Sequence, residues 1–122
     1  MLYEKESYAV RGALFEVYSV LGMGFSEEIY QEAVERELTL RGIPFEPQKE
    51  LHLFYKGSLM NKTYRADVVC FGAIILELKA VKTLLPEHET QLLNYLKVTR
   101  LKLGLLVNFH HFPVLGIKRL IN

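Results

Sequence analysis

Apolar side chains recur at helical spacing in the first third of the chain and predict two helices. Over residues 5–21 they repeat every three or four positions, at Val10, Leu14, Val17 and Leu21. Gly22-Met23-Gly24 interrupts this pattern. A second helix is expected from an N-cap at Ser26 to about Arg41, because serine is a favoured capping residue and the two glutamates after it suit the positive end of a helix dipole.

The pattern changes after Gly42-Ile43-Pro44, where shorter apolar segments predict strands. We expect strands over residues 45–56, 62–70 and 73–79, with a turn at residues 56–58 and a short link at Phe71-Gly72. Pro86 suits the first turn of a third helix that runs to about Thr99, and strands are expected over residues 103–109 and 114–121. This order, α-α-β-β-β-α-β-β, predicts an α/β fold of the α+β kind, a mixed sheet flanked by helices, in a single domain over residues 1–122.

The composition is that of an ordinary globular protein, with 50% hydrophobic and 24% charged residues in a chain of 122. The one cysteine, Cys70, excludes an intramolecular disulfide and a cysteine-ligated zinc or iron–sulfur site, and we expect it to be a small buried side chain. The charged N-terminus lacks the apolar segment of a signal peptide, and no apolar run approaches the roughly 20 residues of a membrane span. We therefore expect a cytoplasmic protein without a membrane segment.

Charge is distributed unevenly along the chain, although the net charge is only +1. Residues 1–50 carry ten acidic and five basic side chains, whereas residues 51–122 carry four acidic and ten basic side chains. A local basic surface can attract phosphates even when the whole protein is almost neutral. On charge alone, scattered surface lysines remain the simpler interpretation.

The strand expected over residues 73–79 contains two charges in an apolar setting. Side chains alternate faces along a strand, so Glu77 and Lys79 should share a face with Ile75, about 7 Å apart at their Cα atoms. On the preceding strand, alternation groups Asp67 with Arg65 and Val69. The opposite face should then carry Tyr64, Ala66, Val68 and Cys70.

These charged residues suggest a metal site, although simpler interpretations exist. Glu-x-Lys alone is most simply an ion pair at the end of a strand. Asp67 on the neighbouring strand adds a second carboxylate, and magnesium usually takes one or two carboxylates together with water and substrate phosphate. Lys79 could then orient or deprotonate an attacking water, or stabilise negative charge in the transition state.

The spacing of Asp67 from Glu77-Leu78-Lys79 resembles the signature of the PD-(D/E)XK nuclease superfamily, with Ala66 where proline often stands. The segment Gly24-x-x-Glu27-x-x-Tyr30 resembles the signature of the GxxExxY protein family, a branch of that superfamily. This second resemblance extends through nearly the whole chain. It includes residues 42–45, 66–67, 77–80 and 86–96.

The resemblance implies a restriction-endonuclease-like core that hydrolyses phosphodiester bonds with Mg²⁺ or Mn²⁺, with DNA as the favoured substrate. Asp67, Glu77 and the backbone carbonyl of Leu78 would hold the metal, and Lys79 would position or activate the water. Glu27 would be a further ligand, as a glutamate from the N-terminal helix is in related nucleases. Residue patterns alone leave Glu27 equally well explained as a first-turn carboxylate at the head of an apolar stripe.

The third helix combines leucines that should pack, Leu92 and Leu96, with a polar face that holds Gln91 and Tyr95. The resemblance implies that this Gln-x-x-x-Tyr element borders the substrate. His88, close to the same face, could be a proton carrier, a DNA contact or a surface side chain. Because Leu85 stands where relatives often have a capping threonine, we expect a weaker helix start. Weak candidates for phosphate contact are Lys49, Arg65, Lys82, Arg100 and Lys102.

Two rival functions remain open at this point. The chain could be a nucleic-acid-binding module without catalytic activity, or a protein-interaction module in which Glu77 and Lys79 form a structural pair. If it is a nuclease that cuts both strands of a duplex, its small surface favours a homodimer.

Overall fold

The computed structural model describes residues 2–122, and its elements follow the expected order. The three helices are α1 (Glu4–Leu21), α2 (Glu27–Leu40) and α3 (Pro86–Thr99). The five strands are β1 (Phe45–Tyr55), β2 (Ser58–Cys70), β3 (Ile74–Lys79), β4 (Leu103–Asn108) and β5 (Gly116–Ile121). The predicted mixed sheet flanked by helices is therefore confirmed.

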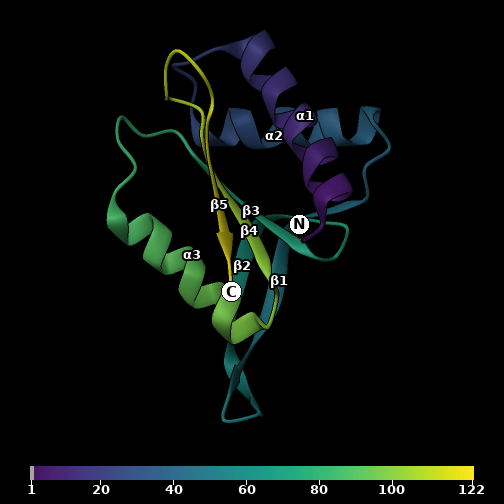
Figure 1. The fold of residues 1–122 in the computed structure, drawn as a ribbon, viewed down its shortest axis with the longest axis vertical. Coiled ribbons are helices and arrows are strands. Elements are labelled where there is room, and N and C mark those ends of the chain that lie inside the picture. Colours follow the sequence, from purple (N-terminus) through teal and green to yellow (C-terminus); the bar gives the residue numbers. More distant parts are fainter. Residues whose placement is uncertain (1) are drawn as a thin grey trace.

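The strands form one sheet in the order β1-β2-β3-β4-β5, and Figure 1 shows this sheet with the helices around it. Neighbouring strands are antiparallel except β3 and β4, which are parallel. A parallel pair needs a crossover connection, and α3 supplies it by returning the chain from the end of β3 to the start of β4. This connection explains why one helix lies between strands that are adjacent in the sheet.

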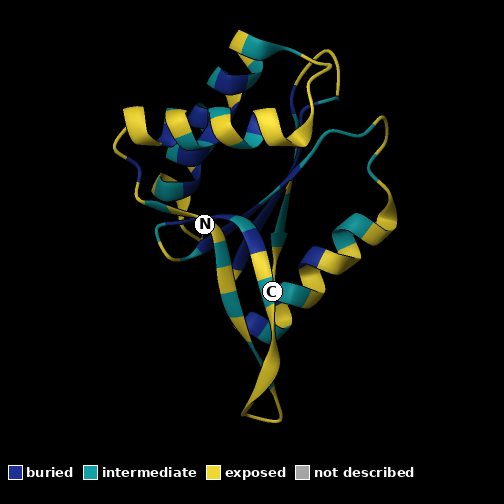
Figure 2. Ribbon diagram, turned by 180° about the vertical axis from the view of Figure 1, so that it is seen from behind, coloured by how far each residue is buried: buried dark blue, intermediate teal, exposed yellow. Residues whose placement is uncertain are grey.

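Helices cover both faces of the sheet (Figures 1 and 2). Buried side chains of α1 and α2 pack on one face against Leu76, Leu105 and their neighbours. Leu92 and Leu96 of α3 pack on the other face against Ile75 and Leu106. Cys70 is buried in the first of these layers, as expected, and burial raises the pKa of its thiol to about 12. The end of β3 lies between these two layers, with a cavity on each side of it.

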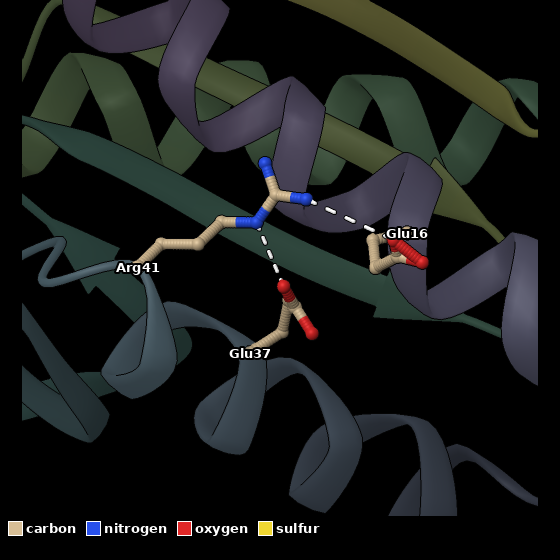
Figure 3. Close-up of polar contacts among 3 residues, drawn as sticks. All are labelled: Glu16, Glu37 and Arg41. Atoms are coloured by element: carbon tan, nitrogen blue, oxygen red, sulfur yellow. Dashed lines mark hydrogen bonds and ion pairs between the residues drawn. The ribbon is translucent and has the colours of Figure 1, made fainter.

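Arg41 ties α2 to α1 (Figure 3). Its guanidinium lies 2.7 Å from the Glu37 carboxylate on its own helix and 4.0 Å from the Glu16 carboxylate on α1. A Cβ atom at Gly12 would come within 2.9 Å of this guanidinium, so a glycine on α1 lets the arginine lie close to the helix. The contact links the two helices of this layer at the surface, but ion pairs this exposed contribute little stability.

The β1–β2 hairpin is longer than the sequence predicts, because β2 begins at Ser58 and not at residue 62. Tyr55 pairs with Ser58 across a turn of two residues, Lys56 and Gly57, which both have positive φ angles (49° and 80°). Turns of this kind match the twist of the flanking strands and let pairing continue to the tip. At the other end of the chain, β5 begins at Gly116, two residues later than expected.

The predicted alternation of β2 is wrong at Asp67. Val68 and Cys70 pack in the α1–α2 layer, but Tyr64 and Ala66 pack in the α3 layer together with Val69. Asp67 and Gln48 are both left out of the pairing between β1 and β2, and Gln48 has a left-handed backbone with φ 48°. This irregularity turns the side chains after Asp67 to the opposite faces from those that strict alternation predicts.

None of the helices in residues 2–122 is both long enough and apolar enough to cross a membrane.

We expect burial, and not the Arg41 ion pairs, to dominate the stability of the helical layer. Leu38→Ala removes a fully buried side chain between α2 and the sheet and should lower the free energy of unfolding by about 2–5 kcal/mol. Arg41→Ala breaks only exposed ion pairs and should cost less than about 1 kcal/mol. Urea denaturation of both variants tests the ranking, and an equal or larger loss for Arg41→Ala would contradict it.

Candidate active site

The site forms where β2 separates from β3. These strands pair at Cys70–Ile74, Val69–Ile75 and Val68–Leu76, and the pairing ends there. Asp67 and Glu77 are the next residue on each strand, and β3 continues beside β4 as far as Lys79–Asn108. The separation therefore leaves Asp67 and Glu77 as the first residues of the two diverging strands that do not pair with each other, with Lys79 two positions further along β3.

Glu77 lies in a cavity between the sheet and α3, of about 210 Å³. We call it the Glu77 cavity. Its lining residues are Tyr64, Arg65, Glu77, Lys79, His88, Gln91, Leu92, Tyr95 and Leu106. The expected substrate-side residues of α3 and the expected lysine of β3 thus reach the same cavity as Glu77.

Tyr64 holds the Glu77 carboxylate from the β2 side. Its hydroxyl donates a hydrogen bond to Glu77 Oε1. The Tyr64 ring is stacked on the ring of Tyr95, with centroids 3.6 Å apart and planes 9° from parallel. This stack links β2 to α3 through their side chains, so the position of Glu77 depends on both elements.

Asp67 points to the other side of the strand ends. Its Oδ2 atom accepts a hydrogen bond of 2.8 Å from the Leu78 amide, and its backbone carbonyl accepts one of 2.9 Å from Gln31 Nε2 on α2. Asp67 and Leu78 line a separate small cavity with Glu27 and Gln48. The predicted signature residues are therefore neighbours, but Asp67 and Glu77 open toward different hollows.

Burial shifts the protonation of both carboxylates. Loss of solvent raises the pKa of Glu77 to about 7, and the nearby Lys79 ammonium and a hydrogen bond from the Asp67 amide only partly oppose this rise. Burial also raises the pKa of Asp67, against the lowering effects of the Leu78 amide and Lys79. Each carboxyl therefore lacks the positive charge that would fully compensate its ionised form.

Glu27 approaches the site from α2. Its Oε2 atom accepts a 3.3 Å hydrogen bond from the amide of Ala80, directly after Lys79. Its negative charge contributes to the raised pKa of both Asp67 and Glu77. Within residues 2–122, however, no three acidic, histidine or cysteine side chains come close enough together to hold a metal, so Glu27 does not complete a three-carboxylate cluster.

Tyr30 fixes the loop that presents Glu27. The Tyr30 hydroxyl donates a 2.6 Å hydrogen bond to the Gly22 carbonyl and accepts one of 3.3 Å from the Phe25 amide. Its ring is fully buried and stacks on Phe109, with centroids 4.3 Å apart. In the same loop Gly24 adopts a positive φ of 104°, which favours glycine. The glycine and the tyrosine of Gly24-x-x-Glu27-x-x-Tyr30 therefore both have structural roles.

His88 has a structural role that was not among the three expected for it. It lines the Glu77 cavity, and its Nδ1 atom accepts a 3.0 Å hydrogen bond from the Leu85 amide. Leu85 itself supplies no side-chain cap, as expected from its chemistry. The histidine ring thus satisfies one otherwise unpaired amide at the start of α3 and offsets part of the expected weakness there.

The five weak cation candidates do not converge on the Glu77 cavity. Only Arg65 lines the Glu77 cavity, and it also lies 3.6 Å from Glu50. Lys49 pairs with Glu46 at 2.6 Å, and Lys82 lines a different cavity beside β5. Arg100 and Lys102 follow the end of α3, where the Arg100 guanidinium lies 4.2 Å from the Phe54 ring centroid.

Three residues of the site escaped the sequence analysis. Tyr64 lies on the opposite side of β2 from Asp67, as alternation predicts, but its contact with Glu77 was not anticipated. Gln31 on α2 carries no signal of its own in the sequence. Asn108 exchanges hydrogen bonds with the backbone of Val81, accepting at 3.1 Å and donating at 2.9 Å, and so fixes the chain after Lys79. A lone asparagine in the apolar segment 103–109 was a usable signal, because buried polar groups require partners.

The donor set suits a hard divalent cation. Two carboxylates with raised pKa values and the Leu78 carbonyl offer oxygen ligands, and magnesium usually needs only one or two carboxylates from the protein. A cation would supply the positive charge that Lys79 only partly provides. By their chemistry these oxygen donors fit Mg²⁺ or Mn²⁺, although Asp67 and Glu77 line different cavities.

Stability without metal should fall as pH rises through the Glu77 transition. Folded Glu77 keeps its proton up to about pH 7, whereas the unfolded residue releases it near pH 4.5, so the folded state binds more protons between these values. The free energy of unfolding should then decrease across this window by up to about 3 kcal/mol more in the natural protein than in Glu77→Gln. Urea denaturation in EDTA measures it, with the exposed Glu4→Gln as control. Parallel pH profiles for the natural protein and Glu77→Gln would contradict the prediction.

A divalent cation should reverse that loss. Above pH 7, manganese at about 100 times its dissociation constant should raise the free energy of unfolding by about 3 kcal/mol, because it binds the folded state. The rise should be absent in Glu77→Gln and retained in Glu4→Gln. Thermal melting with and without manganese tests this directly, and equal stabilisation of all three proteins would refute a site at Glu77.

Comparison with known proteins bears on the fold and on the family of the chain. The crystal structure of SSO0001 is similar in fold, with a TM-score of 0.61 and 20% sequence identity over 98% of this chain and 59% of that chain. This chain thus spans about three fifths of that solved chain, and at this identity the likeness supports the fold alone. Three chains of solved structures match in all, whereas no curated protein does. The model of the PD-(D/E)XK nuclease superfamily matches residues 4–120, and the chain therefore belongs to that superfamily.

Proposed function

We propose that this protein is a metal-dependent nuclease that hydrolyses phosphodiester bonds, with DNA as its substrate. The observation that carries the proposal is the meeting of Asp67, Glu77 and Lys79 where β2 leaves β3, beside a cavity that also receives polar residues of α3. Superfamily membership supports the same class of reaction.

The two carboxylates and the Leu78 carbonyl hold the cation. A divalent ion bound there supplies Lewis-acid stabilisation of the negative charge that develops on the phosphate. The Leu78 amide fixes Asp67, and the Tyr64 hydroxyl fixes Glu77, so both carboxylates are oriented before substrate arrives. Such preorganisation lowers the reorganisation needed in the transition state. Glu27 adds a further carboxylate at the end of β3 and is the remaining candidate ligand.

Lys79 positions or activates the attacking water. Its ammonium shares the Glu77 cavity and lies close enough to both carboxyls to lower their pKa values. A cation at this point can donate hydrogen bonds to the water and to the phosphate oxygens. Asn108 holds the backbone of Val81, two residues after this lysine, by two hydrogen bonds.

The α3 side of the cavity receives the substrate. Gln91 offers an amide and Tyr95 an aromatic face with a hydroxyl, and both line the cavity with His88. Because His88 Nδ1 accepts the Leu85 amide, its Nε2 atom is the one left to contact substrate. Arg65 adds a positive charge beside the same opening and can pair with a phosphate.

The chain further fits the GxxExxY branch of the superfamily. Gly24, Glu27 and Tyr30 have the spacing of that signature. The hydrogen bonds of Tyr30 and the contact of Glu27 with Ala80 explain why this spacing matters: the tyrosine holds the loop, and the loop directs the glutamate to the end of β3.

A cleavage assay tests the proposal. Single- and double-stranded DNA are incubated with purified protein in manganese, magnesium or EDTA, beside Lys79→Ala and Glu77→Gln. We expect cleavage that requires metal and falls at least about 100-fold in both variants, because each removes a group needed in the transition state.

The control is Arg36→Ala, which removes an exposed cation on α2 outside both cavities. It should cleave like the natural protein. If the folded protein binds manganese and DNA but produces no cleavage, the non-catalytic binding module replaces the nuclease proposal. If it binds neither, the protein-interaction module does.

A further inference from the structure

The tip of the β1–β2 hairpin projects from the rest of the fold (Figures 1 and 2). We call residues 54–63 the arm. Residues 55–63 are all exposed, and β3 pairs only with the far end of β2, at residues 68–70. The end of α3 lies against the base of the arm, because the Arg100 guanidinium sits 4.2 Å from the Phe54 ring centroid. The arm and the end of α3 therefore form one continuous surface.

The charged side chains of the segments that form this surface are all basic, and they lie among exposed apolar side chains such as Tyr55 and Leu59. Residues 51–66 and 90–106 contain no aspartate or glutamate. Their cations are Lys56, Lys62, Arg65, Lys97, Arg100 and Lys102. Among residues 2–122, only Arg65 of these six makes an ion pair, with Glu50. Like charges without partners repel one another, so the surface is complementary to a polyanion.

The surface also has a fixed relation to the site. The tip residue Gly57 lies ten positions before Asp67 along the hairpin strand, which corresponds to about 30 Å at the usual rise per residue. One helical turn of a nucleic-acid duplex measures about 34 Å. In addition, α3 carries Gln91 and Tyr95 into the Glu77 cavity, and Arg100, directly after the helix, contacts Phe54 at the base of the arm. A duplex seated at the site would therefore run along this surface.

We propose that the arm and the end of α3 bind the phosphate backbone of a nucleic-acid duplex about one helical turn from the Asp67–Glu77 site. The inference rests on the proposed function and deepens it, because it makes the substrate a duplex that extends well beyond the bond to be cleaved. The arm contributes affinity and register, not sequence recognition, since lysines contact phosphates as point charges.

Salt dependence of binding tests the arm. The variant Lys56→Asn/Lys62→Gln removes two arm charges and keeps the turn, because Asn-Gly suits this turn type. The control Lys5→Gln/Arg36→Gln removes two exposed charges from α1 and α2. Binding to a duplex of about two helical turns is measured in EDTA over a range of salt concentrations. The slope of log K against log salt should shrink by about 2 in the arm variant, about 0.9 per lost phosphate contact, and stay unchanged in the control.

A second pair, Lys62→Gln/Lys97→Gln, leaves the turn intact and should give the same loss of slope, so a folding defect at the tip does not obscure the result. An unchanged slope in both pairs overturns the proposal. It is also overturned if both pairs lose binding to anionic phospholipid vesicles while duplex binding is unaltered. The two proposals fail separately: a slope change without metal-dependent cleavage sinks only the nuclease, and cleavage with an unchanged slope sinks only the arm.

Discussion

The separation of β2 from β3 after the Val68–Leu76 pair is the constraint on which the rest of the site depends. Two strands that stayed paired would place Asp67 and Glu77 in a continuous ladder, with their backbone amides engaged across it. Divergence instead releases the Leu78 amide to hold the Asp67 carboxylate. The same divergence lets the hairpin leave the sheet. One backbone event thus produces both the acidic centre and the exposed arm.

Two raised pKa values show what this arrangement costs. Carboxylates removed from water need compensating charge, and Lys79 provides only part of it. The rest of the fold offsets this cost through apolar packing on both faces of the sheet, with the leucines of α3 on one of them. A site that is short of positive charge in its resting state is well matched to a cation and to water-mediated hydrolysis of an anionic substrate.

The order of elements could be read from the sequence because each has a strong local signal: helical spacing in α1 and α2, a proline at the start of α3, and apolar runs in β3 and β4. The grouping of Glu77 with Lys79 followed from strand alternation. Alternation failed at Asp67, because the irregularity opposite Gln48 depends on two strands at once. For the same reason the Tyr64–Glu77 hydrogen bond and the Tyr64–Tyr95 stack could not be predicted: both join elements distant in sequence. The mixed sheet itself is confirmed, whereas the roles of individual site residues stay predictions.

The parallel pairing of β3 with β4 also has a consequence for the order in which the molecule assembles. Its first pair joins Ile74 to Leu103, a separation of 29 residues (103 − 74), whereas the β1–β2 hairpin closes across two. Contacts distant in sequence form late, because the entropy of closing a long loop must be overcome before they stabilise the chain. The hairpin can therefore form early, while Lys79 reaches its place beside Asn108 only when α3 has docked and the crossover has closed. On this argument the arm forms before the acidic centre, and the end of α3 joins the arm in one surface only when the site itself is completed.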